Sequence, residues 1–340
     1  MTKKIKIAEL FCGPGGFALG AKLSKNFKHV WLVDNDLDSL KTIKQNMPDQ
    51  NTIHQDVQKF SKTKNLKSIK RKYGSFEGLV FGFPCNDFSI VGKKRGFAGK
   101  YGGLYKYACK VLKFFRPNFF IAENVSNLGT LNKKSKINKN FKKILFDFKK
   151  LGYEIKFKKI KFEKFKIPQR RHRIIIIGHK KNCNLKNFKF PKESNNLVTC
   201  KKALEKLYKY KNLYNHETYK HSEKIKKRLR KIKQGQNVWQ INGLPNVKKA
   251  RMSNIYKKLD PTKPAYTVTG SGGGGTHMYH YKFLRALTNR ERATLQTFPK
   301  TYIFVGKKES VRKQIGMAVP PMGAKTIFDN LKKHYYSRQS

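Results

Sequence analysis

The sequence predicts an α/β fold in which a mixed, mostly parallel sheet is joined to a second, smaller and more irregular domain. Short apolar strands alternate with helical segments over about the first half of the 340 residues, which is the pattern of a parallel sheet covered by helices. Glycines, acids and a cysteine follow the ends of these strands, where open α/β sheets bind ligands. Beyond residue 180 the sequence becomes irregular, very basic and glycine-rich.

The first predicted strand and helix enclose a glycine-rich turn. Residues 4–10 alternate like a strand, residues 18–21 begin a helix, and Phe-Cys-Gly-Pro-Gly-Gly-Phe lies between them at 11–17. Strand, glycine turn and helix in this order are typical of nucleotide-binding folds, because glycines let a ligand approach the backbone. The spacing is not GxGxxG, so the turn alone is as consistent with packing as with a cofactor loop.

Acids follow the second and third predicted strands. Residues 29–33 end at Asp34, and a short strand beginning at residue 52 ends at Asp56, with a helix at 37–46 between them. Asp34 is placed to hydrogen-bond ribose hydroxyls. Asp56 is placed to accept from an adenine amino group, or to cap a helix. With the glycine turn, these acids favour a nucleoside-type cofactor. The sequence has no GxxxxGK[ST] motif for a triphosphate.

The fourth strand, at residues 79–81, delivers Cys85. Glycine and proline follow the apolar run and cannot extend a central strand, so the chain turns and presents the cysteine at the strand's carboxyl end. A thiolate there is a candidate nucleophile, and a small buried hydrophobe is the alternative. The basic, glycine-punctuated residues 91–103 are interpreted as a mobile loop that meets phosphates, or as a solvated surface loop.

A carboxylate and a basic segment complete the candidate site. Glu123 ends the fifth strand. Its carboxylate is a candidate for a second chemical group of the site, and the alternatives are a helix N-cap or a structural ion pair. Gln169, Arg171 and Arg173 precede an apolar strand and would share one face of an extended segment, suited to anion or base contact. The remaining elements expected in this half are helices at 104–115 and 137–150 and strands at 119–122, 153–162 and 174–178.

Composition suggests the partner and the compartment. Lysine and arginine number 77 against 20 acids, a formal net charge of +57, which favours a polyanionic partner such as nucleic acid. Five cysteines at scattered positions argue against a disulfide framework and against a zinc site. We expect no signal peptide and no membrane span. A reducing, prokaryotic cytoplasm is the inferred location.

Taken in order, these motifs resemble the DNA cytosine-5 methyltransferase family, of the prokaryotic restriction–modification type. The resemblance extends over nearly the whole chain. The matching pieces are the glycine turn at 11–17, Asp34, Asp56, Gly-Phe-Pro-Cys at 82–85 with Phe88 and Ser89, Glu-Asn-Val at 123–125, Gln-Arg-Arg-His-Arg at 169–173, and the segments 285–299 and 314–321.

The resemblance implies a Rossmann-like, S-adenosylmethionine-dependent methyltransferase fold. It implies that a methyl group passes from S-adenosylmethionine to C5 of a cytosine flipped out of duplex DNA. The residues implied to hold the cofactor are Phe11, Gly13, Gly15, Gly16, Phe17, Asp34, Asp56 and Pro84.

The resemblance also implies a set of catalytic residues. Cys85 would attack C6 of the cytosine, because C5 of the aromatic ring is a poor nucleophile until sulfur adds beside it. Glu123 would hydrogen-bond N3 and the exocyclic amine as charge develops. Arg171 and Arg173 would hold O2 and depress the pKa of the thiol. No metal is expected.

The family pattern further implies three segments. Residues 1–180 would bind cofactor and perform catalysis, 181–283 would recognise the target, and 284–340 would comprise a hinge motif and a C-terminal helix returning to the catalytic domain. The basic run at 225–232 contacts phosphates in this view, or is only a solvated helix face. The residues expected to contact DNA are Ser89, Lys93, Lys94, Arg95, Gln169, Arg228, Arg230, Thr267, Gly272 and Gly273.

Two positions depart from the family pattern, and two other functions stay open. Asn86 stands where glutamine is common, and Met317 where asparagine is usual; the second bears on cofactor binding. The alternatives are the tRNA-methylating branch of the same fold, whose Cys-Phe-Thr signature is absent, and an inactive DNA-binding relative. The expected partners are double-stranded DNA and a restriction endonuclease acting on the same site, with the enzyme itself monomeric.

Overall fold

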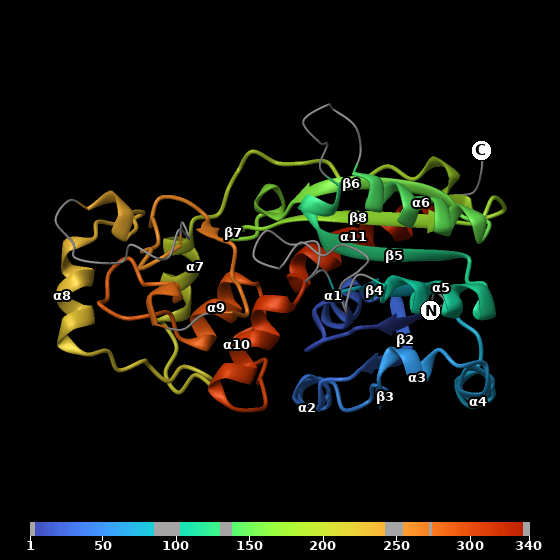
Figure 1. Ribbon diagram of the computed structural model, residues 1–340, viewed down its shortest axis with the longest axis horizontal. Coiled ribbons are helices and arrows are strands. Elements are labelled where there is room, and N and C mark those ends of the chain that lie inside the picture. Colours follow the sequence, from blue (N-terminus) through green and yellow to red (C-terminus); the bar gives the residue numbers. More distant parts are fainter. Residues whose placement is uncertain (1–3, 85–102, 130–137, 242–253, 272–273, 336–340) are drawn as a thin grey trace. The chain divides into compact units, whose positions relative to one another are not determined.

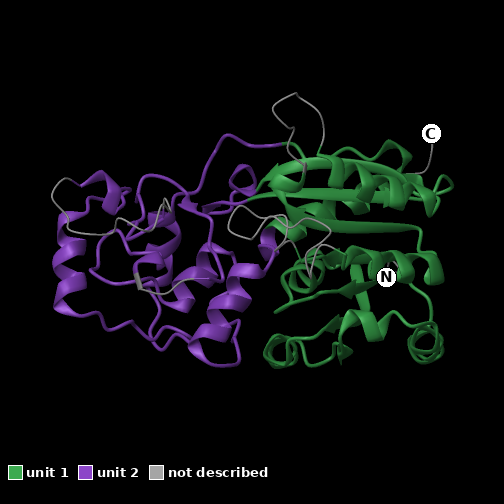
Figure 2. Cartoon of the chain, viewed as in Figure 1, with its two compact units in different colours: residues 1–161, 172–192, 323–340 green, residues 162–171, 193–322 purple. Residues whose placement is uncertain are grey.

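The computed structural model describes residues 4–84, 103–129, 138–241, 254–271 and 274–335. The chain divides into two compact units (Figure 2). Unit 1 comprises residues 1–161, 172–192 and 323–340, and unit 2 comprises 162–171 and 193–322. Both units are therefore discontinuous in sequence.

Unit 1 is built on a seven-stranded sheet (Figure 1) with the strand order β3-β2-β1-β4-β5-β8-β6. The five strands β1 to β5 pair in parallel with their neighbours in this order, whereas β8 is antiparallel to both β5 and β6. The expectation of a mixed, mostly parallel sheet is confirmed. The strands are β1 Ile5–Leu10, β2 Phe27–Asp34, β3 Thr52–His54, β4 Gly78–Gly82, β5 Phe119–Val125, β6 Glu154–Lys161 and β8 His172–His179.

Helices cover both faces of this sheet, which explains why its central strands are apolar on both sides. Alternate residues of β2 show the division, since Trp31 belongs to the core cluster with α3 to α6 and Leu32 to the cluster with α1 and α2. The helices of unit 1 are α1 Gly16–Ser24, α2 Leu37–Asn46, α3 Val57–Phe60, α4 Thr63–Tyr73, α5 Tyr105–Phe115, α6 Lys139–Lys150 and α11 Pro321–Tyr335.

The last helix of the chain packs against the first. Phe328 of α11 meets the ring of Phe17 edge-on at 6.2 Å and the ring of Phe27 at 4.8 Å. At the end of α11, Tyr335 lies 5.5 Å from Phe119 of β5. These aromatic contacts attach the C-terminal segment to the sheet next to the glycine turn.

Unit 2 has little regular structure apart from its helices. A two-stranded parallel ladder joins β7, Gln169–Arg170, to β9, Ala265–Tyr266. Residues 162–171 and 284–322 both belong to this unit, so its boundaries differ from those of the expected functional segments, whose roles remain a prediction. The helices are α7 Cys200–Leu207, α8 Glu223–Lys231, α9 Asn289–Leu295 and α10 Lys308–Met317.

Candidate active site

The turn after β1 has an unusual backbone. Phe11, Gly13 and Gly15 have φ values of 55°, 50° and 85°, in the left-handed region that glycine adopts without strain. Phe11 is held there despite its side chain, as is common at functional sites. A Cβ built on Gly13 would meet nothing within 4 Å, so the space beside this backbone is open to a ligand.

Asp34 connects the turn after β1 to the turn after β2. Its Oδ2 accepts a hydrogen bond from the Gly13 N–H at 2.8 Å, and its Oδ1 accepts from the Asp36 N–H at 2.9 Å. Burial raises the pKa of the Asp34 carboxyl group, while these hydrogen bonds oppose the rise. Because a carboxylate has about four acceptor positions, both oxygens retain capacity for hydroxyl donors.

Asp56 and Phe17 also have structural partners. Asp56 caps helix α3, with its Oδ1 accepting from the Gln58 N–H at 2.7 Å. The capping interpretation of this residue is therefore confirmed, and it leaves Oδ2 available for another donor. Phe17 is buried in the first turn of α1 against Phe328. Gly16 begins the same helix, and no acidic residue occupies its first turn.

The ends of β4 and β5 lie side by side. Gly82 is the register partner of Glu123, and a Cβ at Gly82 would come within 3.3 Å of Glu123 Oε2. Asn124 Nδ2 donates to the Phe83 carbonyl at 2.9 Å, which ties the chain before Pro84 to the end of β5. Cys85, Ser89, Lys93, Lys94 and Arg95 lie outside the described residues.

Glu123 forms an ion pair with Arg173. The Arg173 Nε lies 2.8 Å from Glu123 Oε1, and the two side chains are only 15% and 12% exposed. Antiparallel pairing of β8 with β5 places Arg173 opposite Val125, and Arg173 Nη1 also donates to the His172 carbonyl at 2.8 Å. A charge-assisted pair in a low-dielectric setting holds the carboxylate in a defined orientation.

Arg171 lies between two strands, whereas Arg173 lies within the second of them. The expected extended segment is interrupted, because β7 ends at Arg170 in unit 2 and β8 begins at His172 in unit 1. The Arg171 guanidinium is buried within unit 2, where Nη1 donates to the Val268 carbonyl at 3.1 Å. Gln169 and Arg171 both contact Val268, as a common face predicts, whereas Arg173 pairs with Glu123 in unit 1; a common face for all three stays a prediction.

Gln169 is fully buried in unit 2. Its Nε2 donates to the Leu295 carbonyl at 3.0 Å and to Gln296 Oε1 at 2.7 Å, while its Oε1 accepts from the Val268 N–H at 3.0 Å. An amide with these partners has no exposed surface for DNA, which corrects the expectation of a DNA contact. Thr267 is partly exposed and its Oγ1 donates to the Arg170 carbonyl at 2.6 Å, so its contact with DNA stays a prediction.

The other expected DNA contacts in unit 2 lie on helix α8. Arg228 is half-buried, with its guanidinium 4.8 Å above the ring of Tyr256. Arg230 is exposed and lies 3.8 Å from Glu223. Gly272 and Gly273 lie outside the described residues.

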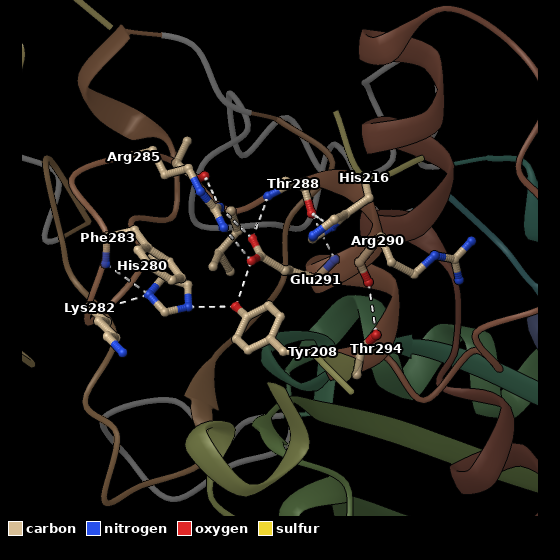
Figure 3. A network of polar contacts seen from close by, with 12 residues as sticks. Tyr208, His216, His280, Lys282, Phe283, Arg285, Thr288, Arg290, Glu291 and Thr294 are labelled. Atoms are coloured by element: carbon tan, nitrogen blue, oxygen red, sulfur yellow. Dashed lines mark hydrogen bonds and ion pairs between the residues drawn. The ribbon is translucent and has the colours of Figure 1, made fainter. Parts of the chain in front are cut away.

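A buried polar network in unit 2 was not anticipated from sequence (Figure 3). Glu291, fully buried, accepts from Arg285 at 2.7 and 2.8 Å, from the Tyr208 hydroxyl at 2.6 Å and from the Thr288 N–H at 2.8 Å. The capping box of α9, Thr288 with Glu291, was the one signal available. The network connects the end of α7 to the start of α9.

His280 extends this network in a single protonation state. Its Nδ1 accepts from the Lys282 N–H at 2.8 Å, so we assign the proton to Nε2, which lies 2.7 Å from the Tyr208 hydroxyl. Burial lowers the pKa of His280 to about 4. The imidazole is therefore neutral at neutral pH, and Tyr208 can donate onward to Glu291.

Membrane-spanning helices and metal-binding clusters are both absent from the described residues. No helix among them has the length and apolar character required to cross a membrane. No group of three or more His, Cys, Asp or Glu side chains in the same part of the chain is arranged to hold a metal ion.

The sheet order, the glycine turn, the acids after the first strands and the Glu123–Arg173 pair define the class as an α/β protein of the methyltransferase type. The chain belongs to the C-5 cytosine-specific DNA methylase family, whose model matches residues 5–333. It is accordingly a DNA (cytosine-5-)-methyltransferase.

Relatives resemble the chain over nearly its whole length. It is 45% identical to the type II methyltransferase M.BbvI of Brevibacillus brevis, over 98% of this chain and 92% of that protein. It is 33% identical to the type II methyltransferase M.NgoFVII of Neisseria gonorrhoeae, over 98% and 89%. A prophage-encoded E. coli protein of known structure shares the fold, with a TM-score of 0.74, 23% identity and coverage of 97% and 99%.

Proposed function

We propose that this chain is the site-specific modification enzyme of a type II restriction–modification system. The observation that supports the chemistry is the Glu123–Arg173 pair, 2.8 Å apart, at the end of β5 and beside the strand that leads to Cys85. The relatives named as type II methyltransferases support the biological setting. The proposed partners are duplex DNA and an endonuclease of the same specificity, with a monomeric enzyme acting in the prokaryotic cytoplasm.

The first strand ends fit S-adenosylmethionine, which when bound supplies the methyl group. Asp34 retains acceptor positions for ribose hydroxyls, and the backbone at Gly13 has open space beside it. Asp56 keeps one carboxylate oxygen for the adenine amino group, as its contact to Gln58 uses the other. We propose that Phe11, Gly15, Gly16, Phe17 and Pro84 complete the cofactor site.

In the proposed reaction the Cys85 thiolate adds to C6 of a flipped cytosine, and the electron pair of the C5–C6 bond becomes available at C5. Glu123 hydrogen-bonds N3 and the exocyclic amine as charge develops, and Arg173 holds both Glu123 and the base O2. After C5 is methylated, its proton leaves and the C–S bond breaks, which regenerates the thiolate. Arg171 acts as a positioning residue through the Val268 carbonyl.

Mapping of 5-methylcytosine tests the function directly. Expression of the chain in a host without cytosine methylation is expected to place 5-methylcytosine in one short DNA sequence, at single-base resolution, and an empty vector is expected to place none. Soluble protein that binds S-adenosylmethionine but methylates no DNA would contradict the proposal. RNA would then be the next substrate to test.

Replacing Asp34 with alanine is expected to weaken S-adenosylmethionine binding by about ten- to a hundredfold. The change removes an acceptor of ribose hydroxyls and frees the Gly13 turn, and a hydrogen bond to a charged group contributes about 1.5–3 kcal/mol. Calorimetric titration of the cofactor measures the effect. Asp49→Asn, an exposed acid of unit 1, is the control, and equal affinities in the two variants would remove Asp34 from the site.

Replacing Glu123 with glutamine is expected to lower the rate of methyl transfer by roughly 10²–10⁴-fold, the usual range for a proton-transfer group. Glutamine keeps the shape of the side chain but loses the charge that pairs with Arg173. Single-turnover kinetics separate this step from binding. Glu205→Gln on the exposed face of α7 is the matched control, and an unchanged single-turnover rate in Glu123→Gln would leave the pair a structural role only.

A further inference from the structure

Helix α9 contains two buried arginines with opposite environments. Every side-chain nitrogen of Arg290 donates to a protein oxygen: Nε to Tyr214 at 2.9 Å, Nη1 to Pro299 at 3.0 Å and Nη2 to Tyr302 at 2.5 Å. Arg292 is 1% exposed, yet the one hydrogen bond of its side chain to the described residues is a long contact of 3.4 Å from Nε to the Leu287 carbonyl. Its Nη1 and Nη2 find no acceptor among the residues that the structure describes.

Other buried polar atoms without partners among the described residues belong to side chains that interact electrostatically with Arg292. They are Nε of Arg312 on α10, the hydroxyl of Tyr219 and Nδ1 of His277, which is a donor or acceptor according to its tautomer; in the described chain none has a hydrogen-bond partner. The His277 ring lies 5.1 Å from that of Tyr219, and Lys308 Nζ lies 5.1 Å from the same ring. We call Tyr219, His277, Arg292, Lys308 and Arg312 the basic cluster; all belong to unit 2.

The basic cluster has an excess of positive charge. Burial lowers the pKa of Arg292 to about 10, so its guanidinium stays charged at neutral pH. Burial, followed by the charges of Arg292 and Arg312, lowers the pKa of His277 to about 4. Glu309 is the acid whose charge reaches His277, and it is exposed at the start of α10.

Glu291, the carboxylate of α9, attracts Arg292 but forms no hydrogen bond with its guanidinium. Glu291 is bound by Arg285, by the Tyr208 hydroxyl and by the Thr288 N–H. A buried guanidinium whose Nη1 and Nη2 lack acceptors in the described chain is unfavourable, because these groups have lost their hydration and gained no hydrogen bond. Planar guanidinium groups bind the oxygens of phosphate with matched geometry, and Tyr219 and Lys308 provide additional donors toward the surface.

We propose that the basic cluster is an oxyanion site that takes a phosphate group, either from the DNA backbone or as free phosphate. The site does not depend on the methyl-transfer chemistry; only the DNA source rests on the proposed function. Arg292 and Arg312 bind the anion, and His277, Tyr219 and Lys308 line the approach to them.

Thermal melting of the full chain in sodium phosphate, compared with sodium chloride at equal ionic strength, tests the site. The melting temperature of the wild type is expected to rise with phosphate concentration and to respond less to chloride. Arg312→Gln and Arg292→Met are expected to lose the phosphate response, and Arg292→Met to melt no lower than the wild type without phosphate, since an unpaired buried charge has been removed. Lys67→Gln, at an exposed lysine of α4, should respond like the wild type.

An equal response to the two salts in the wild type, or a full phosphate response in Arg312→Gln, would overturn the proposal. Arg312→Gln keeps the test decisive if Arg292→Met does not fold, because Arg312 lies nearer the surface, at 8% exposed. These measurements need neither DNA nor methyl transfer. If the chain proved not to methylate DNA, the melting measurements would still test the oxyanion site.

The salt dependence of DNA binding shows whether the phosphate bound at the basic cluster comes from the DNA backbone or from free phosphate. If a backbone phosphate occupies the basic cluster, Arg312→Gln should reduce the slope of log affinity against log salt by about 0.9, the value for one neutralised phosphate, with a smaller reduction in Lys67→Gln. An unchanged slope together with a lost phosphate response in melting would assign the site to free phosphate. An unchanged slope together with a retained response would overturn the proposal.

Discussion

A chain in which Cys85 is replaced by alanine is expected to form no detectable 5-methylcytosine while it still binds S-adenosylmethionine and DNA. Without the thiolate, C5 is not activated and the reaction loses its covalent route. Base-resolution mapping measures the loss. DNA with fluorine in place of the C5 hydrogen should also form a covalent complex with the wild type, since no proton can leave, and none with the variant.

The other four cysteines provide the matched controls. Cys12, Cys109, Cys183 and Cys200 are free thiols in the described part of the chain. Burial raises the pKa of each, to about 12 for Cys109 and Cys200, so all four stay protonated and unreactive at neutral pH. Cys109→Ala should therefore methylate normally, and methylation by Cys85→Ala would place the nucleophile elsewhere.

The fold was predictable where local sequence determines burial. Strands β1, β2, β4, β5 and β8 read as apolar or alternating runs because helices cover both faces of the sheet. Helix α4, Thr63–Tyr73, was not anticipated, since it is rich in lysine and buries only Leu66. Its apolar face is narrow, formed by Leu66, Ile69 and Tyr73, and the many lysines around it make the segment resemble a solvated surface stretch.

In the candidate site too, features set by local sequence were predictable and features set by contacts distant in sequence were not. Asp34 ends β2, Glu123 follows the apolar run 119–122 and Asp56 lies two residues after β3, so each could be placed near a strand end. The partner of Glu123 depends on the antiparallel register of β5 with β8, which no local pattern specifies. Gln169 and Arg171 are bonded to residues 126 and 97 positions away, and no local pattern in the sequence specifies such distant partners.

Replacing Gly316 with alanine is expected to destabilise unit 2 by about 3 kcal/mol or more, although alanine in an ordinary helix position would stabilise by about 1 kcal/mol. A Cβ at Gly316 would lie 1.9 Å from the Gly270 nitrogen and 2.1 Å from the Thr269 carbonyl carbon. Both are backbone atoms and cannot rotate away. Helix α10 would have to separate from residues 269–270.

The surrounding hydrogen bonds prevent a small shift of either backbone from relieving this clash. Gln296 Nε2 holds the Ile315 carbonyl at 2.6 Å and the Ala318 carbonyl at 3.2 Å, on either side of Gly316. Arg171 and Gln169 hold Val268 just before the opposing segment. Both backbones are thus fixed, and relief of the clash would break buried hydrogen bonds.

Urea unfolding of Gly316→Ala, with Gly103→Ala as control, measures this effect. A Cβ at Gly103 would meet nothing within 4 Å, so the control should unfold close to the wild type. Because Gly316 lies in unit 2 and Asp34 in unit 1, the variant should lose DNA affinity before it loses S-adenosylmethionine affinity. Equal urea midpoints for the two variants would mean that α10 does not pack closely on residues 269–270.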